Sequence, residues 1–163
     1  MPENDVAPAA LSGATVFIKP KRARPFFGRH PWALDSAILR VDGNPDSGDV
    51  VDVVTHDGNF IARGLWNASS RIRVRLYSFV QDQALDEVFW NARIENAVGL
   101  RQQLGLLSKK TGCRLINSEG DSLSGVIVDQ YGSYLALQVT ALAMAERLDM
   151  ICDSLERLVQ PKG

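Results

Sequence analysis

The residues of this sequence best suited to chemistry are cations that could bind phosphate. Five basic residues and no acid occur between Val6 and Leu34, and aromatic rings lie among them. An ordinary solvated loop is the simpler interpretation, but uncompensated cations beside aromatic rings favour a surface that contacts phosphates and stacks on unpaired bases. The candidate phosphate-binding and stacking residues of this segment are Lys19, Lys21, Arg22, Arg24, Arg29, His30 and Trp32.

A second group of cations alternates along a strand-like segment. Arg71, Arg73 and Arg75 occupy every second position, so they share one face of the strand predicted for residues 71–79. Like charges at this spacing repel each other, and they need either carboxylate partners or a phosphate backbone over them. The sequence has no acid from Gly58 to Gln81. An RNA-binding strand and a structural ion-pair network both stay open as interpretations.

The sequence shows no recognisable catalytic motif. It has no glycine-rich phosphate loop and no Ser, Cys and His placement typical of a triad. We expect Cys113 and Cys152 to be reduced packing residues. Glu119 and Asp121 lie in one loop, where turn chemistry explains them better than a metal site. We therefore predict no catalytic, cofactor-binding or metal-binding residue in this chain.

The net charge of -1 conceals a difference between the two halves of the chain. Residues 14–81 have ten Lys and Arg against six Asp and Glu, whereas residues 82–163 have eight against eleven. The basic half is therefore the one expected to meet a polyanion. The 163-residue chain is 45% hydrophobic and 23% charged, an ordinary globular composition. Because no membrane helix or signal peptide is evident, we expect a cytoplasmic protein with no membrane partner.

Turn and periodicity signals in the basic half predict a β-rich unit. Residues 1–14 have no periodicity and are expected to be a disordered tail. Pro31 is expected to start a short helix. Residues 49–66 predict a β-hairpin with a two-residue turn at Asp57-Gly58, and the arginine strand follows.

The acidic half is predicted to contain two helices and three strands. Asp82 is expected to cap a helix that continues to about Leu104. A strand at 113–116 and a hairpin with strands at 125–129 and 134–140 should follow. Thr140 is expected to cap a final helix, along which apolar residues recur as one buried stripe. The residues of this stripe are Met144, Leu148, Ile151, Leu155 and Leu158.

Short motifs in a fixed order resemble a known family. Arg29-His30-Pro31-Trp32, Gly48 to Val54, Gly58, Ala62-Arg63-Gly64 and Ile72 to Arg75 resemble the N-terminal PUA domain of bacterial S-adenosylmethionine (SAM)-dependent methyltransferases that make 5-methylcytosine in large-subunit ribosomal RNA. Arg114-Leu115-Ile116 and the segment from Glu119 to Gly132 are similar to that family's central α/β domain. The family usually reads Glu-x-Asp-Gly-Leu-Pro-Gly before Asp-Arg-Tyr-Gly, and here the glycine, proline and arginine are replaced by Ser122, Ser124 and Gln130.

The resemblance extends over about Thr15 to Val159 and implies an α+β fold. A PUA-like small β-barrel at residues 15–80 would be followed by a partial α/β domain of helix, β-hairpin and helix at residues 81–163. The chain would be the RNA-binding and substrate-positioning portion of a class I RNA methyltransferase, with ribosomal RNA as its partner. The family's Rossmann-like domain and catalytic cysteine are expected to be missing, so SAM would be a cofactor of the parent family and not of this chain.

Two alternatives to this function stay open. The chain could be a stand-alone PUA-containing RNA-binding adaptor. It could also be a protein-interaction module, in which the arginine strand pairs with acids and an open edge of the C-terminal sheet forms a homodimer.

Overall fold

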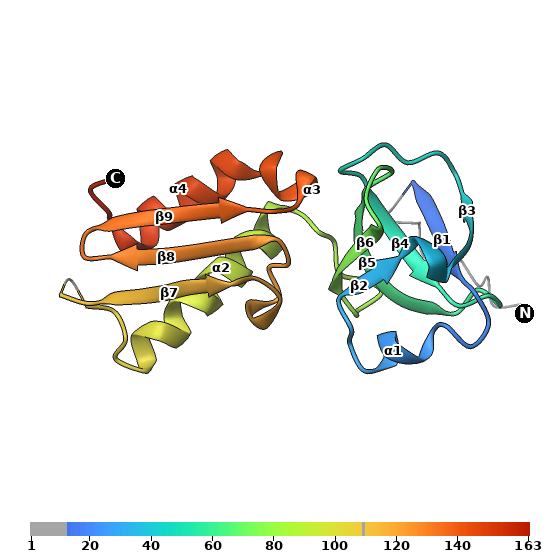
Figure 1. Cartoon of the computed structure of the whole chain (residues 1–163), viewed down its shortest axis with the longest axis horizontal. Helices are drawn as coiled ribbons and strands as arrows, with labels where there is room; N and C mark the ends of the chain where they lie inside the picture. The colour runs from blue at the N-terminus through green and yellow to red at the C-terminus, as the bar shows by residue number, and fades with distance from the viewer. Residues whose placement is uncertain (1–12, 109) are drawn as a thin grey trace, which may run out of the picture.

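The computed structural model describes residues 13–108 and 110–163, which form two sheets placed side by side along the long axis of the molecule (Figure 1). The first sheet has six strands and is curled into a half-barrel, and the second has three strands with helices on one face. The α+β prediction is therefore confirmed. The predicted tail over residues 1–14 lies outside the described residues except at its end, where Ala14 is already a buried residue of the first strand.

The first sheet has the strand order β2-β6-β5-β4-β1-β3. Neighbouring strands are antiparallel except β1 and β4, which are parallel. Inward-facing valine, isoleucine and alanine side chains fill the curl and form one hydrophobic core. The strands are β1 (Ala14–Ile18), β2 (Trp32–Leu34), β3 (Ile38–Asp42), β4 (Val50–Val54), β5 (Phe60–Trp66) and β6 (Ile72–Ser78), and the helical turns are α1 (Arg24–Phe27) and η1 (Asp35–Ala37).

The predicted hairpin is present as β4 and β5, but its turn differs from the prediction. The loop has three residues, because the Thr55 amide donates to the Asn59 carbonyl and the Gly58 amide donates to the Thr55 carbonyl. Gly58 has a φ of +92°, the left-handed conformation that such loops place on glycine. Further along β5, a Cβ on Gly64 would lie 2.2 Å from the Arg75 carbonyl oxygen, so β5 and β6 approach too closely there for a side chain.

The helix predicted at Pro31 is wrong. Residues 32–34 form β2, which pairs antiparallel with β6 and places Trp32 opposite Arg75. The Pro31 carbonyl also accepts a hydrogen bond from the Leu76 amide. Pairing with a neighbouring strand satisfies these backbone groups, which outweighs the local preference of proline for a helix start.

The second sheet has the order β7-β8-β9, with both pairs of neighbours antiparallel. The long helices α2 and α4 lie against the same face, as Figure 1 shows. No helix among the described residues is long and apolar enough to cross a membrane. The elements are α2 (Glu87–Gln103), β7 (Gly112–Asn117), η2 (Ser118–Asp121), β8 (Val126–Tyr131), β9 (Tyr134–Val139), α3 (Leu142–Ala145) and α4 (Leu148–Val159).

Both predicted helix caps of this half are wrong. The cap of α2 is Asp86, whose carboxylate accepts a hydrogen bond from the Phe89 amide, and not Asp82. Thr140 is not a cap, because the N-cap position of α3 is Ala141, which has no side-chain hydrogen bond to the helix. The predicted final helix is also divided into α3 and α4 by Glu146 and Arg147. Met144, Ile151 and Leu155 of the predicted stripe are buried. Leu148 is 38% exposed and Leu158 is half-buried.

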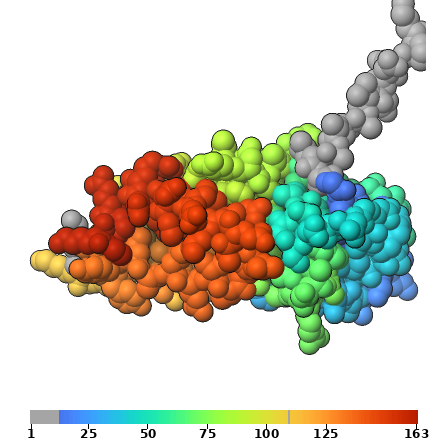
Figure 2. All heavy atoms as spheres, turned by 90° about the horizontal axis from the view of Figure 1, so that it is seen from above, coloured from blue at the N-terminus to red at the C-terminus, as the bar shows by residue number. Residues whose placement is uncertain are grey.

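The core of the second sheet extends into the first. Leu65 of β5 and Tyr77 of β6 belong to the same buried cluster as the apolar faces of α2, β7 and β8. Figure 2 shows the two halves in continuous contact. The position of one sheet relative to the other is therefore held by side-chain packing as well as by the connecting chain.

Candidate nucleic-acid interface

An open hollow of about 440 Å³ lies between α1 and the turn that joins β4 to β5. Three of the candidate cations, Lys19, Lys21 and Arg24, line it together with Phe27. Lys19 donates from Nζ to the Ser36 carbonyl, 3.0 Å away. None of these three cations forms an ion pair with a carboxylate within residues 13–108 and 110–163. Three cations and one carboxylate, Asp57, line the hollow, so an anion would meet a net positive charge there.

The other exposed candidates lie outside this hollow. Arg22 and Arg71 are exposed and have no carboxylate partner in the described part of the chain. The Arg29 guanidinium lies 6.0 Å from the centre of the Phe79 ring. His30 is exposed, but its Nδ1 lies 3.2 Å from the Trp32 amide nitrogen, and the two rings meet edge to face. The candidate cations of this segment and His30 are therefore exposed, but they do not form one cluster, and the phosphate-contacting surface stays a prediction.

Trp32 and Arg75 lie at the junction between the two sheets. Trp32 Nε1 donates to Glu119 Oε1 at 3.0 Å, and Arg75 Nη1 lies 3.3 Å from the same oxygen. Ser124 completes the group: Arg75 donates to its Oγ at 2.7 Å, and that hydroxyl donates to Glu119 at 2.7 Å. The Tyr77 hydroxyl donates to the Ser124 carbonyl at 2.7 Å. We call these five residues the junction cluster.

The junction cluster changes the acidity of two of its members. Burial raises the pKa of Glu119, whereas hydrogen bonds from Ser124, Ser118 and Trp32 lower it, and the net result is a pKa below its ordinary value. Burial raises the pKa of Tyr77 well above its usual range. At neutral pH the cluster therefore contains a carboxylate, a guanidinium and a neutral phenol, which is a stable set of donors and acceptors.

The arginine strand does not present three equivalent cations. Arg75 is 17% exposed and pairs with Glu119, so the ion-pair interpretation holds for this residue. Arg73 donates to the Asn67 and Ala68 carbonyls and lies 5.5 Å from the Trp66 ring centre. Arg71 alone is exposed with no such partner in the described residues. The acid that sequence reasoning required for Arg75 is Glu119 of η2, between β7 and β8 and 44 residues away in the sequence.

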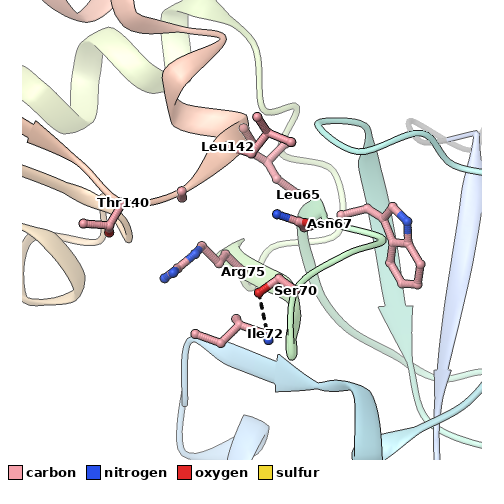
Figure 3. Close-up of a pocket in the computed structure, with 10 residues that line it drawn as sticks. Leu65, Asn67, Ser70, Ile72, Arg75, Thr140 and Leu142 are labelled. Atoms are coloured by element: carbon pink, nitrogen blue, oxygen red, sulfur yellow. Dashed lines mark hydrogen bonds between the residues drawn. The ribbon is translucent and has the colours of Figure 1, made fainter.

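Beside the junction cluster is a small cavity of about 40 Å³, shown in Figure 3. Its walls come from both halves, with Leu65 and Asn67 from the first and Thr140 and Leu142 from the second. This volume is close to that of a single water molecule. The junction is therefore well packed and too tight for a nucleotide.

Sequence reasoning missed the role of the loop at residues 117–125. Asp121 does serve the local structure, since it pairs with Arg101 and accepts from the Asn117 amide, which confirms turn chemistry. Glu119 and Ser124, in contrast, bind residues of the first sheet. The acid-free stretch around Arg75 was the one signal that a distant carboxylate was needed. Within the described residues, no three His, Cys, Asp or Glu side chains lie together as a metal site would require.

The chain is similar to known proteins over most of its length. Residues 16–79 match a family described as a PUA-like domain. The chain is 34% identical over 145 residues to a Ribosomal RNA large subunit methyltransferase I of Aeromonas hydrophila, covering 89% of this chain and 36% of that protein. With its counterpart in Shewanella denitrificans it shares 37% over 139 residues, covering 85% of this chain and 35% of the relative. The chain thus spans about a third of the length of the curated relatives it matches, and it is homologous to them over that part.

Solved structures show the same fold at lower sequence similarity. A Streptococcus mutans protein described as a SAM-dependent methyltransferase aligns with a TM-score of 0.75 at 14% identity, covering 90% of this chain and 38% of that one. A second structure, SMU.776, described as a methyltransferase complexed with SAH, aligns with a TM-score of 0.70 at 18% identity, covering 90% and 37%. The arrangement of the half-barrel beside the three-stranded sheet is therefore shared with these structures.

Proposed function

We propose that this chain, whose residues 16–79 match a PUA-like domain, is the RNA-binding and substrate-positioning part of a cytoplasmic SAM-dependent methyltransferase that acts on large-subunit ribosomal RNA. The observation that carries the proposal is the 34% sequence identity, over 89% of the chain, with the Ribosomal RNA large subunit methyltransferase I of Aeromonas hydrophila. The resemblance of the motifs further suggests cytosine C5 as the position that is methylated.

The chain matches about a third of its relatives, which bears on where RNA binding and catalysis would lie. The matched third has no catalytic motif in its sequence, so we place methyl transfer and SAM binding in the parts of the relatives that lie outside it. The exposed cations of the half-barrel would then contact RNA phosphates. The junction cluster would keep this RNA-binding surface in a constant position relative to the second sheet, and thereby position the substrate.

Salt-dependent RNA binding tests this proposal. We expect fluorescence anisotropy to show that the chain binds a large-subunit ribosomal RNA fragment with an affinity that falls steeply with salt, by about 0.7 to 0.9 in log–log slope per phosphate contacted. The double charge reversal Lys21→Glu with Arg24→Glu should reduce both the affinity and that slope, because it removes two uncompensated cations.

The matched control is Arg157→Glu. This arginine is 55% exposed on α4 and pairs only with Glu95 among the described residues, so its reversal should leave RNA binding unchanged. A flat salt response of the unmodified chain, or an equal loss in the control, would contradict the proposal.

A further inference from the structure

The hollow beside α1 has two sides of different chemistry. Lys21, Arg24 and Phe27 form one side, and the β4–β5 turn contributes Asp57 and Asn59 to the other. Cations bind phosphate, an aromatic ring stacks on a base, and short polar side chains hydrogen-bond to the edge of a base. The hollow therefore combines the three kinds of contact that a single unstacked nucleotide makes, and its volume is within the range of about 300–1,000 Å³ of small-ligand sites.

Phe27 supplies the stacking surface. Its side chain is 69% exposed, whereas that of its neighbour Phe26 is 3% exposed and anchors α1 in the core. An exposed phenylalanine contributes little to packing, yet this one lies on the wall of a hollow lined by cations. Stacking of a base on such a ring is worth about 1–3 kcal/mol, whatever the base.

The turn supplies an oriented acceptor. The Asp57 carboxylate accepts hydrogen bonds from Thr55 Oγ1 and from Asn59 Nδ2, the latter at 3.0 Å. The bond from Thr55 is the main reason why the pKa of Asp57 is lowered, so the group is an anion at neutral pH. A carboxylate accepts from an exocyclic amino group, as aspartate does from cytosine N4. Uracil has no such group, and its one donor on that edge, N3–H, lies between two carbonyl oxygens that the negative charge would repel.

We propose that this hollow binds one unstacked nucleotide whose base has an exocyclic amino group, with its phosphate on Lys21 and Arg24, its face on Phe27 and its edge toward Asp57. The inference rests on the proposed RNA-binding function and adds a base preference to it. Cytidine, adenosine and guanosine have such an amino group, and uridine does not.

Oligonucleotides with a single base test the inference. The probes are nine-residue ribose-phosphate strands that are abasic except for a central cytidine, adenosine or uridine, together with a fully abasic strand, and anisotropy measures their binding. We expect the cytidine and adenosine strands to bind at least fivefold more tightly than the abasic strand, since about 1 kcal/mol of stacking is a factor of about five. Phe27→Ala should abolish that gain and Phe27→Tyr should keep it.

The acceptor is tested by Asp57→Ala, which should remove the preference of cytidine over uridine while leaving the affinity for the abasic strand unchanged or higher. Leu39→Ala, which removes an apolar side chain 46% exposed elsewhere on the half-barrel, should change nothing. Equal binding of all four strands by the unmodified chain, or a base preference that survives Phe27→Ala and Asp57→Ala, would overturn the inference while leaving RNA binding intact. Failure of every strand and of the ribosomal RNA fragment would instead refute the proposed function itself.

Discussion

Residues of similar chemistry serve two purposes in this chain: some hold the junction together, and others are free to bind a ligand. Arg75 and Trp32 have the chemistry of RNA-binding residues, but both bind Glu119 of η2. Lys21 and Arg24 have comparable chemistry and no carboxylate partner among the described residues. The side chains available to a phosphate are therefore distinguished by their partners and not by their type.

At the residue scale, Ser122 is predicted to be a site of strain. Its φ is +59°, which lies in the left-handed region. For a non-glycine residue this conformation costs about 1–2 kcal/mol of conformational free energy. Glycine avoids this cost, but its greater freedom in the unfolded chain costs about 0.5–1 kcal/mol on folding. We therefore expect Ser122→Gly to raise the free energy of unfolding in urea by about 0.5–1 kcal/mol. Ser122→Ala keeps the strain and should have almost no effect, so equal stabilisation by both variants would argue against this explanation.

Glu119 is predicted to make the stability of the junction depend on pH. Its pKa is lowered in the folded chain, so its contribution is fully present above the ordinary pKa of a glutamate and is lost as the pH falls through the lowered value. Glu119→Gln keeps the shape but not the charge that pairs with Arg75. We therefore expect this variant to be less stable than the unmodified chain at pH 7 and equally stable near pH 2, as measured by thermal unfolding.

The pH comparison has its own control in Glu95→Gln. Glu95 is half exposed and pairs with the equally exposed Arg157, an arrangement that contributes little to stability. A pH-dependent difference as large for Glu95→Gln as for Glu119→Gln would show that the effect is general and does not come from the junction cluster.

At the element scale, the start of α2 depends on one carboxylate. Asp86 accepts from the Phe89 amide at 2.9 Å and satisfies one of the free amides at the helix start. We expect Asp86→Ala to lower the free energy of unfolding by about 1 kcal/mol. Asp82→Ala is the matched control and should have no measurable effect, because Asp82 lies before the helix; the opposite order of effects would mean that α2 begins earlier in solution.

The errors in element prediction have a common physical cause. The start of a helix is predicted from capping residues and proline, which reflect only local preference. At β2 and at the break between α3 and α4, contacts with distant parts of the chain are present as well. β2 forms because β6 is there to pair with it. At the break, a Cβ on Gly48 would lie 2.1 Å from a Glu146 carboxylate oxygen, so the segment between α3 and α4 packs directly against the first half of the chain.

At the scale of the whole molecule, the two halves are predicted to unfold together. Leu65 is 2% exposed and belongs to β5, yet it packs in the core of the second sheet. Leu65→Ala should therefore lower stability by about 2–5 kcal/mol and should accelerate amide hydrogen exchange in β7 and β8 as well as in β4 and β5. Val53→Ala, which alters only the first core, is the comparison; exchange in β7 and β8 that is insensitive to Leu65→Ala would mean that the halves are independent.

The sequence by itself determined most of the local structure and the chemical class of the surface. Alternation along 72–78 and the turn signal at Gly58 identified their strands, because these patterns reflect neighbours in the chain. The excess of cations in the first half favours a polyanion as the partner, and the order of its motifs is the basis for proposing RNA. These features depend on composition and short spacing, which the sequence displays directly.

Only the tertiary structure decided which of the candidate residues remain available to a ligand. Glu119 is 44 residues from Arg75 and 87 from Trp32 in the sequence, and no local pattern relates them. The same holds for the hollow, in which α1 meets a turn that lies about thirty residues further along. Contacts between residues so far apart in the sequence depend on how the elements pack, and packing is a property of the whole chain.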